Sequence, residues 1–318
     1  MKRIYKIASG IFIAVALILV GGGIYLKYFL PNIKIKDLKV EVTKERVERG
    51  RYLANCVLVC VDCHSVRDWS RYSGPIIPGS IGMGGEVFDQ TMGLPGKYIA
   101  PNITPYTMSK WSDGEIYRAI TSGVGKRGNA LFPIMPYMAY GTLDNEDIFS
   151  VIAYLRSLTP IQSDIPASKS DFPVNFIVNT LPKEGHPTKR PSPKDSLEYG
   201  KYLTIAASCL DCHTPFVKGS LVMEKAFSGG REFPTKDGRI AVSANITFDP
   251  NSGIGKWDKE TFIGTFKYFD IPNNETAQVG PDKINSPMPW TMYSKMDTLD
   301  LVAIYTYLKS LRPIAVKR

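Results

Sequence analysis

Cysteine and histidine are scarce in this sequence, and tracts of low complexity are absent. The 318 residues include five cysteines and three histidines, with 44% hydrophobic and 22% charged side chains. This balance is typical of a globular protein, and the length suffices for two domains of ordinary size. The net charge is +9, but no concentrated stripe of lysine and arginine and no nucleic-acid motif accompanies it, so a nucleic-acid partner is not expected.

Charged residues are also absent from residues 7–26, which are predominantly apolar. A helix of this length rises about 30 Å, the thickness of the hydrocarbon core of a bilayer. Lys2, Arg3 and Lys6 precede the run, and this bias predicts a cytoplasmic N-terminus with the rest of the chain exported. A cleaved signal peptide is the alternative, although no small-x-small cleavage site closes the run. We expect a retained single-pass anchor in the inner (cytoplasmic) membrane, with the remainder facing the periplasm or the cell exterior.

Most of the scarce residues belong to two copies of one pentapeptide, Cys-x-x-Cys-His. The copies contain Cys60, Cys63 and His64, and Cys209, Cys212 and His213. In such a motif each thiol adds across one haem vinyl group, and the following histidine becomes the proximal ligand of the iron. The sequence therefore predicts two covalently bound haem c groups, with His64 and His213 as iron ligands.

Other uses of these cysteines explain the pattern less well. The two pairs are too far apart in the sequence for a zinc finger or ribbon, and the βαβ context of a thioredoxin-like pair is missing. Local disulfides would suit an oxidising compartment but would leave the two histidines unexplained. Cys56 lies outside both motifs; a redox-active thiol or an extra ligand is one interpretation, and a small buried hydrophobe is the one we expect. We expect His186 at the surface.

The two motifs lie inside a duplication that covers almost the whole exported part. Residues 48–53 (ERGRYL) correspond to residues 198–203 (EYGKYL), and Asn-Ile-Thr recurs at 102–104 and 245–247. The first copy has one extra residue before its first haem cysteine, near Cys56, which predicts a bulge or a shifted turn. We therefore predict an all-α fold with two tandem cytochrome c-type domains and long loops, preceded by one transmembrane helix.

The duplication also sets the expected boundaries and core. The boundaries are an anchor at 1–30, a linker at 31–43, domain 1 at 44–164, a proline-rich connector at 165–194 and domain 2 at 195–318. Ser112 and Glu115 have the spacing of a capping box, and Asp144 and Asp297 can N-cap the last helix of each copy. The apolar stripes on those last helices, which should be core positions, are Ile148, Val151, Ile152 and Leu155, and Leu301, Ile304, Tyr305 and Leu308.

Two methionines are the best candidates for the sixth ligand of the two irons. Met135 and Met288 occupy equivalent places in the repeat, each before a proline and well downstream of its Cys-x-x-Cys-His. Proline disfavours helix for the residue before it, so each methionine is presented from a loop. A thioether is a soft, neutral ligand that raises the reduction potential. Met138, Met292 and Met296 lie nearby, but neither Met138 nor Met292 recurs at the equivalent position of the other copy.

These segments resemble the cytochrome c subunits of bacterial membrane-bound alcohol and sugar dehydrogenases. The resemblance covers residues 44–315 and is carried by the haem motifs, the Asn-Ile-Thr segments and the Met-Pro-aromatic segments. It implies His/Met ligation, a periplasmic location, and electron delivery from a dehydrogenase toward quinone or an oxidase. It also implies that Trp111 and Trp257 contact the haem propionates or the haem edge. Those subunits usually carry three haem domains and this chain has two motifs, so the particular dehydrogenase stays open.

We expect an electron-transfer protein without substrate chemistry of its own. Each iron would be closed by a histidine and a methionine, so no coordination position would be free for a substrate. The expected partners are redox proteins, namely a dehydrogenase, a terminal oxidase or another cytochrome. The alternatives are a dihaem enzyme such as a peroxidase or thiosulfate dehydrogenase, which needs an open iron site, and a haem-based sensor, which needs a signalling module.

Overall fold

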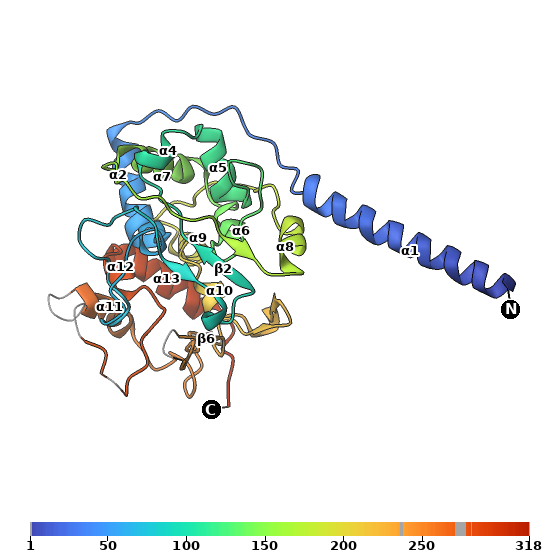
Figure 1. Cartoon of the computed structure of the whole chain (residues 1–318). Helices are drawn as coiled ribbons and strands as arrows, with labels where there is room; N and C mark the ends of the chain where they lie inside the picture. Colours follow the sequence, from blue (N-terminus) through green and yellow to red (C-terminus); the bar gives the residue numbers. More distant parts are fainter. Residues whose placement is uncertain (1, 236–237, 271–277, 281, 318) are drawn as a thin grey trace.

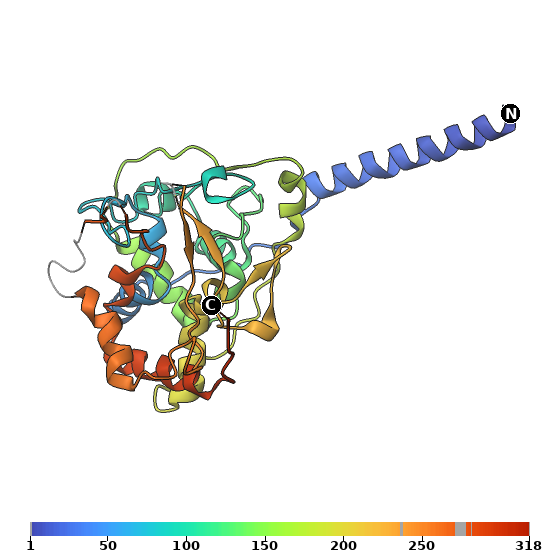
Figure 2. The same cartoon turned by 90° about the horizontal axis from the view of Figure 1, so that it is seen from below.

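The computed structural model shows one long helix that projects from a rounded body (Figures 1 and 2). The structure describes residues 2–235, 238–270, 278–280 and 282–317. Residues 1 and 318, the outer ends of the expected anchor and second domain, lie outside the described residues. The body is mainly helical, as expected, and its long loops also contain short strands. We call residues 44–158 the first repeat and residues 196–311 the second repeat.

The elements follow one another in a similar order in the two repeats. The first repeat contains α2 (Lys44–Tyr52), the π-helix η1 (Leu53–Val57), α3 (Cys60–Cys63), the 3-10 helix η2 (Gln90–Met92), α4 (Pro105–Met108), α5 (Asp113–Ser122), α6 (Tyr137–Tyr140) and α7 (Asn145–Ser157). The second repeat contains α9 (Ser196–Ala206), α10 (Cys209–Cys212), the 3-10 helices η4 (Met223–Lys225) and η5 (Tyr268–Asp270), α11 (Lys259–Lys267), α12 (Trp290–Tyr293) and α13 (Thr298–Ser310). The strands are β1 (Val87–Phe88), β2 (Gly96–Ile99) and β3 (Lys169–Ser170), which form one antiparallel sheet, and the hairpins β4 (Phe216–Val217) with β5 (Ser220–Leu221) and β6 (Glu232–Pro234) with β7 (Ile240–Val242).

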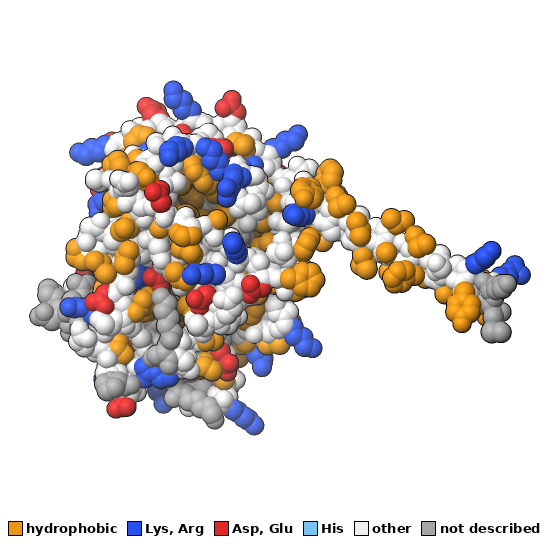
Figure 3. Space-filling model, in the orientation of Figure 1, with side chains coloured by type: hydrophobic (Ala, Val, Ile, Leu, Met, Phe, Trp, Pro, Cys, Tyr) orange, Lys and Arg blue, Asp and Glu red, His pale blue; other side chains and the backbone are white. Residues whose placement is uncertain are grey.

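The projecting helix, α1 (Lys2–Tyr28), carries apolar side chains along its length that the body does not cover (Figure 3). In the part of the chain that the structure describes, it is the one helix long and apolar enough to cross a membrane, by length and composition. Basic side chains lie at its free end, and the rings of Tyr25 and Phe29 stack at 5.8 Å at the end next to the body. Such a surface is unstable in water and fits a lipid environment.

Each repeat is built on a crossing of its first and last long helices. α2 packs against α7, and α9 packs against α13. A Cβ on Gly50 would lie 1.8 Å from the carbonyl oxygen of Ser150, and a Cβ on Gly200 would lie 1.9 Å from that of Ala303. The duplicated Gly-x-Tyr-Leu sequence therefore lets two backbones touch at a distance that only glycine permits.

Helix starts follow the sequence in most places. Ser112 and Glu115 form the predicted capping box at the start of α5. Asp144 caps α7 by accepting a hydrogen bond from the backbone N–H of Glu146 at 2.9 Å. Asp297 occupies the equivalent N-cap position of α13, but its side chain makes no capping hydrogen bond, so that part of the prediction was wrong. The predicted apolar stripes on α7 and α13 are buried, which confirms them as core.

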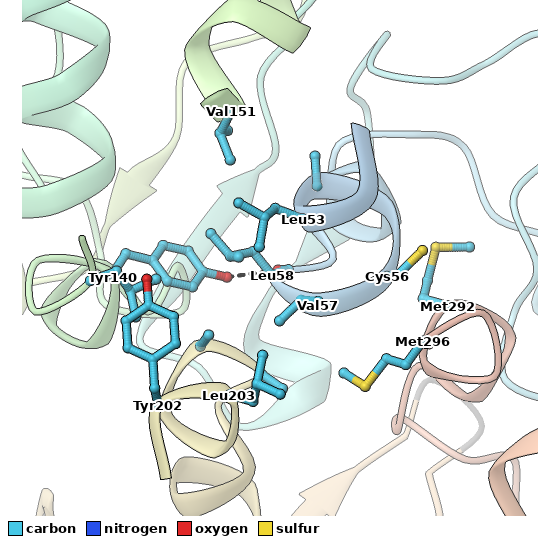
Figure 4. Packing of buried hydrophobic residues seen from close by; sticks show 14 of the residues in the cluster. Leu53, Cys56, Val57, Leu58, Tyr140, Val151, Tyr202, Leu203, Met292 and Met296 are labelled. Carbon is cyan, nitrogen blue, oxygen red and sulfur yellow. Dashed lines mark hydrogen bonds between the residues drawn. The ribbon is translucent and has the colours of Figure 1, made fainter. Parts of the chain in front are cut away.

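The extra residue of the first repeat is accommodated in a π-helix. η1 continues α2 with the wider turn, and the N–H of Leu58 donates to the carbonyl of Leu53 at 2.8 Å. The second repeat lacks this residue, and α9 runs as a regular helix to Ala206. The predicted bulge is therefore confirmed. Cys56 lies on η1, buried among apolar side chains that include Met292 and Met296 of the second repeat (Figure 4).

The two repeats contact each other through exchanged pairs of equivalent residues. The Tyr52 hydroxyl donates to Asp300 at 2.7 Å, and the Tyr202 hydroxyl donates to Asp147 at 2.7 Å. The short helices that follow the methionine loops are exchanged in the same way, since α6 contacts α9 and α12 contacts η1. Buried side chains of both repeats belong to one continuous cluster, part of which is shown in Figure 4. The repeats are thus related by an approximate two-fold axis.

The segment between the repeats packs on the first repeat. β3 pairs with β2, and the N–H of Thr188 donates to the carbonyl of Thr142 at 3.0 Å. Its helix α8 (Val174–Ile177) and the 3-10 helix η3 (Val178–Thr180) lie beside the body end of α1. His186 is exposed, as expected.

Candidate haem sites

Each Cys-x-x-Cys-His motif forms one turn of helix followed by its histidine. Residues three apart share a helix face, so α3 presents the Cys60 and Cys63 thiols on one side, and α10 does the same with its two cysteines. Both turns begin after a residue in the left-handed conformation, Val59 with φ 49° and Ser208 with φ 53°. All five cysteines of the chain are unpaired. The thiols of each motif are therefore available together for one planar group with two vinyl substituents.

The two histidines are oriented by backbone carbonyls. Nδ1 of His64 lies 2.8 Å from the carbonyl oxygen of Pro101, and Nδ1 of His213 lies 2.7 Å from that of Ala244. A carbonyl can only accept, so each Nδ1 carries the proton and each Nε2 keeps its lone pair. Burial lowers the pKa of both imidazoles, which favours this neutral form. A neutral ring with a free Nε2 is the form that binds iron.

The recurring Asn-Ile-Thr segments hold those carbonyls in place. Oδ1 of Asn102 accepts the backbone N–H of Thr104 at 2.8 Å, and Oδ1 of Asn245 accepts that of Thr247 at 2.9 Å. Their amide groups donate to the chain beyond the last helix of each repeat, at the carbonyls of Ile161 and Ile314. Pro101 and Ala244, which carry the histidine-binding carbonyls, directly precede the two asparagines. The duplicated motif therefore supports the histidine of each Cys-x-x-Cys-His motif.

The two candidate distal methionines lie in matching turns. The N–H of Tyr137 donates to the carbonyl of Met135, and the N–H of Trp290 donates to that of Met288, both at 2.8 Å. With φ −79° and ψ 51° to 64° at the intervening prolines, these are inverse γ-turns. Met135 and Met288 are half-buried and pack against the core.

A tyrosine links each methionine turn to the chain just before the attachment helix of its own repeat, which is α3 in the first repeat and α10 in the second. The Tyr140 hydroxyl donates to the carbonyl of Leu58 at 2.8 Å, and the Tyr293 hydroxyl donates to that of Ala207 at 2.6 Å. Leu58 and Ala207 each lie two residues before the first cysteine of a motif. Each methionine turn is thereby linked to the chain just before its Cys-x-x-Cys-His turn.

The other methionines near these turns are placed differently. Met138 is 56% exposed and lies at the surface. Met292 and Met296 are buried between the repeats, on the side of η1 that carries Cys56 (Figure 4). Met135 and Met288 are thus the pair that recurs in both sequence and geometry.

Trp111 and Trp257 are half-buried against the core, directly before α5 and α11. The carbonyl of Trp111 accepts from Arg156 at 2.6 Å, and that of Trp257 accepts from Tyr305 at 3.2 Å. Their backbones are therefore fixed to the last helix of each repeat. Contact between their rings and haem stays a prediction.

An acidic residue inside each motif has a basic partner that sequence reasoning missed. Asp62 is buried and pairs with buried Arg67 at 2.9 Å. Burial raises the pKa of Asp62 to about 6, and Arg67 opposes the shift. Asp211 is less buried; Arg231 donates to its backbone carbonyl at 2.5 Å, and burial again raises the pKa of the carboxyl. No local sequence pattern predicts these pairs, because Arg67 follows Asp62 by 5 residues and Arg231 follows Asp211 by 20 residues.

The donor set fits haem attachment at two sites. Burial raises the pKa of the thiols of Cys60, Cys63 and Cys209 to about 12, so they are protonated at neutral pH. A metal site built from thiolates would need these thiols deprotonated, which the raised pKa values oppose. Across the described ranges, no three or more His, Cys, Asp or Glu side chains cluster in a way that could hold a metal ion, so the two motifs do not combine into one such site.

Comparisons with known proteins agree with this chemistry. No protein-family model matches the chain. It is 28% identical over 288 residues to the cytochrome c subunit of alcohol dehydrogenase (quinone) from Gluconacetobacter polyoxogenes, a match that covers 84% of this chain and 56% of the relative. It is 28% identical over 283 residues to the gluconate 2-dehydrogenase cytochrome c subunit of Pantoea cypripedii, which covers 83% of this chain and 59% of the relative.

A shorter relative matches over more of its own length. The chain is 25% identical over 247 residues to a diheme cytochrome c-type protein of Cereibacter sphaeroides, covering 73% of this chain and 77% of the relative. By contrast, the chain spans little more than half the length of the dehydrogenase subunits, 56% and 59%. The protein is therefore a homologue of the cytochrome c subunits of alcohol, gluconate and fructose dehydrogenases, which confirms the resemblance seen in its motifs.

Proposed function

We propose that this protein is a membrane-anchored dihaem cytochrome c that carries electrons on the periplasmic side of the inner membrane. The observation that carries the proposal is the complete duplication of the site. Each repeat has two unpaired thiols on one helix face, a histidine whose Nδ1 donates to a carbonyl, and a methionine in a γ-turn tied to the attachment helix. The domains of the proposal are residues 44–164 and 195–318, joined by the connector at 165–194.

Covalently bound haem would supply one reversible electron at each iron between the ferric and ferrous states. The residues of the chain would hold and shield it. Cys60 and Cys63 would form the thioethers of the first site, and Nε2 of His64 would bind the iron. Met135 would close the opposite face with a neutral sulfur, which favours the reduced state. Cys209, Cys212, His213 and Met288 would do the same at the second site.

The contact between the repeats suits electron transfer from one proposed site to the other within the chain. Tyr140 is buried, and its hydroxyl donates to the carbonyl of Leu58, two residues before Cys60. Its helix α6 also contacts α9 of the second repeat, which ends three residues before Cys209.

The proposed donor is a dehydrogenase, and the proposed acceptor is a terminal oxidase or another cytochrome. The homologues are cytochrome subunits and not the catalytic subunits of their complexes, so we assign a carrier role and no substrate chemistry. The proposed anchor is α1, with its basic end in the cytoplasm. Phe172 and Ile177, next to and within α8, are exposed beside the body end of α1, where apolar side chains would meet the membrane surface.

The first test counts haems and identifies ligands. Intact mass and a pyridine haemochrome assay of protein matured in the periplasm should show two covalent haems per chain. Met135→Ala and Met288→Ala should each remove half of the weak near-infrared sulfur-to-iron band of the oxidised protein. One haem per chain, or haem that acid-acetone extracts, would refute the proposal, and a full band in both variants would refute the ligand assignment.

The second test separates a carrier from an enzyme. Carbon monoxide binds ferrous haem where a coordination position is free or a ligand leaves readily. With both irons closed, we expect little change in the reduced spectrum at neutral pH and no appreciable peroxidase or thiosulfate-oxidising activity. Rapid stoichiometric binding at one haem, together with turnover of peroxide or thiosulfate, would establish the enzyme instead.

A further inference from the structure

The methionine turn of the second repeat is held by a loop of the first repeat. The Ser73 hydroxyl donates to the carbonyl of Met288 at 2.5 Å, and the N–H of Trp290 donates to the same hydroxyl at 3.0 Å. The Ser73 side chain therefore bridges both ends of the γ-turn that presents Met288. It lies 215 residues away from Met288 in the sequence and is fully buried.

Asn285 makes a second connection between the same two segments. Its Oδ1 accepts the backbone N–H of Ser73 at 2.8 Å, and its amide donates to the carbonyls of Trp69 and Arg71 at 3.0 and 2.9 Å. The backbone N–H of Ser286 donates to the same Oδ1, also at 2.8 Å. The chain just before Met288 is thus fixed to the first repeat by three hydrogen bonds through one side chain.

The loop that carries Ser73 is itself rigid, because a buried ion pair fixes it to the first attachment motif. The Arg67 guanidinium pairs with Asp62 at 2.9 Å and donates to the carbonyls of Ser73 and Gly74 at 2.6 and 2.8 Å. It also lies over the ring of Trp69 at 4.1 Å. A continuous chain of contacts therefore links the first Cys-x-x-Cys-His helix, through Arg67 and Ser73, to the Met288 turn.

The methionine turn of the first repeat is supported from within its own repeat. The Phe132 ring stacks on Tyr98 at 4.1 Å, three residues before Met135. The Tyr137 ring packs on Gly123, where a Cβ would lie 2.5 Å from it. The Met288 turn also has support in its own repeat, where the Trp290 ring lies 5.3 Å from Phe266 and 5.0 Å from Phe269. The hydrogen bonds of Ser73 and Asn285 add to it a support from the other repeat.

We propose that Ser73 is a positioning residue for Met288, so that the first repeat holds the distal ligand of the second haem in place. The inference rests on the proposed function, because it requires Met288 to bind iron. An outward movement of the turn would draw the Met288 sulfur away from the iron. Ser73 opposes that movement, because it would break two hydrogen bonds and leave their buried donor and acceptor groups unpaired. The folded first repeat then slows the dissociation of Met288 from the second iron.

The test uses full-length, haem-loaded protein and Ser73→Gly. Glycine removes the hydroxyl and adopts the φ of 61° at this position without strain, so an effect cannot come from a distorted backbone. Ser80→Ala is the matched control, because it deletes another buried hydroxyl of the first repeat, one that bonds to Val66 and Ile77 within that repeat. Asn285→Ala is the second variant, which loosens the same turn and leaves Ser73 in place.

We expect Ser73→Gly to accelerate carbon monoxide binding about tenfold at one of the two ferrous haems, the factor that follows from losing roughly one net hydrogen bond. Half of the near-infrared band should disappear at a lower temperature, with the helical unfolding transition unchanged. Asn285→Ala should act in the same direction, and Ser80→Ala should leave carbon monoxide binding as in the unmodified protein.

The outcomes separate this inference from the proposed function. If Met288→Ala keeps the full band, Met288 is not a ligand and both ideas fall. If Met288→Ala loses half the band while Ser73→Gly and Asn285→Ala bind carbon monoxide at the original rate, the ligand assignment stands and the role of Ser73 is refuted. Equal acceleration by Ser80→Ala would also refute it, since a general loosening of the first repeat would then be the cause.

Discussion

The two repeats place the same groups around their attachment motifs but surround them with different charges. In both, a carbonyl orients the histidine and a tyrosine ties the methionine turn to the attachment helix. In the first, Asp62 forms a buried ion pair with Arg67; in the second, Arg231 reaches a backbone oxygen and lies over the Phe216 and Phe233 rings. The hydrogen bonds that orient the histidines and link the methionine turns are reproduced in both repeats, whereas the charged side chains around the motifs are not.

The same contrast holds where the repeats meet. Asp147 and Asp300 are equivalent, and each accepts from a tyrosine of the other repeat at 2.7 Å. Asp147 also pairs with Arg49 at 3.0 Å and Arg190 at 2.6 Å. For Asp300, burial raises the pKa, so its negative charge is disfavoured in the folded protein. The two-fold arrangement therefore places two arginines on Asp147, whereas the partner of Asp300 is the Tyr52 hydroxyl.

The largest effect should come from removing one attachment motif at a time. Replacing Cys60 and Cys63 by serine should halve the haem content, and so should replacing Cys209 and Cys212. Because the turn of Met288 depends on the first repeat, the first change should also weaken methionine ligation at the remaining haem, whereas the second should not. The pyridine haemochrome assay and the near-infrared band measure both. Equal ligation at the remaining haem in the two variants would contradict the asymmetry.

Substituting the two interface aspartates should come next in size. Asp147→Asn leaves two arginines without their partner and should cost about 2–3 kcal/mol of unfolding free energy, below the value for fully buried pairs because both arginines reach solvent. Asp300→Asn keeps an acceptor for Tyr52 and should be close to neutral at pH 7. Denaturant unfolding measures both, and equal losses would show that the charges are equivalent after all.

The pH dependence of the unfolding free energy of Asp300→Asn tests whether burial raises the pKa of Asp300. A carboxyl whose pKa is raised on folding stabilises the folded state fully below about pH 4, and this contribution is lost as the pH rises through the raised value. The unmodified protein should therefore lose stability over that interval relative to Asp300→Asn. Parallel stability curves for the two proteins would show that burial does not shift the pKa of this group.

The two helix crossings, α2 with α7 and α9 with α13, are a feature that the repeats share, and alanine substitutions at their glycines test whether they are equally tight. Gly50→Ala and Gly200→Ala should each cost about 1–3 kcal/mol, since the new methyl group meets a carbonyl of the partner helix. Gly264→Ala in α11 is the control, because nothing lies within 4 Å of its Cβ position, and it should stabilise by about 0.5–1 kcal/mol. Thermal or denaturant unfolding would expose any inequality between the two crossings.

The smallest effect should come from Cys56, which has no equivalent in the second repeat. Burial raises the pKa of its thiol to about 11, so it is neutral at pH 7. Cys56→Ser should keep the haem content and optical spectrum and cost about 1 kcal/mol through a hydroxyl in an apolar place. A shifted Soret band in this variant would instead identify Cys56 as a ligand.

Sequence reasoning predicted features that repeat locally. The bulge at the extra residue, the capping box at Ser112 and the buried stripes were all predicted, because each depends on spacing within a few residues; that the bulge is a π-helix came from the structure. The acceptors of His64 and His213 were not, since Pro101 and Ala244 share no side-chain chemistry and contribute only a carbonyl. The same reasoning erred at Asp297. Its N–H donates to the Tyr52 hydroxyl at 2.9 Å, just as the N–H of Asp144 donates to the Tyr202 hydroxyl at 3.1 Å. The Asp144 carboxylate differs in that it also accepts the N–H of Arg190 from the connector at 2.8 Å, a tertiary contact that local spacing does not reveal.

Contacts between the repeats were beyond reach for a related reason. Ser73 and Met288 are 215 residues apart, and the Tyr52–Asp300 pair is 248 residues apart. Neither pair is marked in the sequence by periodicity or a motif, because each contact forms only when the two folded repeats dock. The duplication indicated that two similar units exist, but equivalent sequences do not reveal which faces meet.

The exchanged tyrosine–aspartate pairs describe an interface of the kind that joins two identical chains, in which residue i meets residue j and residue j meets residue i. The connector makes such an association intramolecular. A short tether holds two units at an effective concentration in the millimolar range, far above that of most membrane proteins as separate chains. The repeats can therefore stay docked through contacts that would be too weak to hold a free dimer, which leaves each copy able to diverge in charge without coming apart.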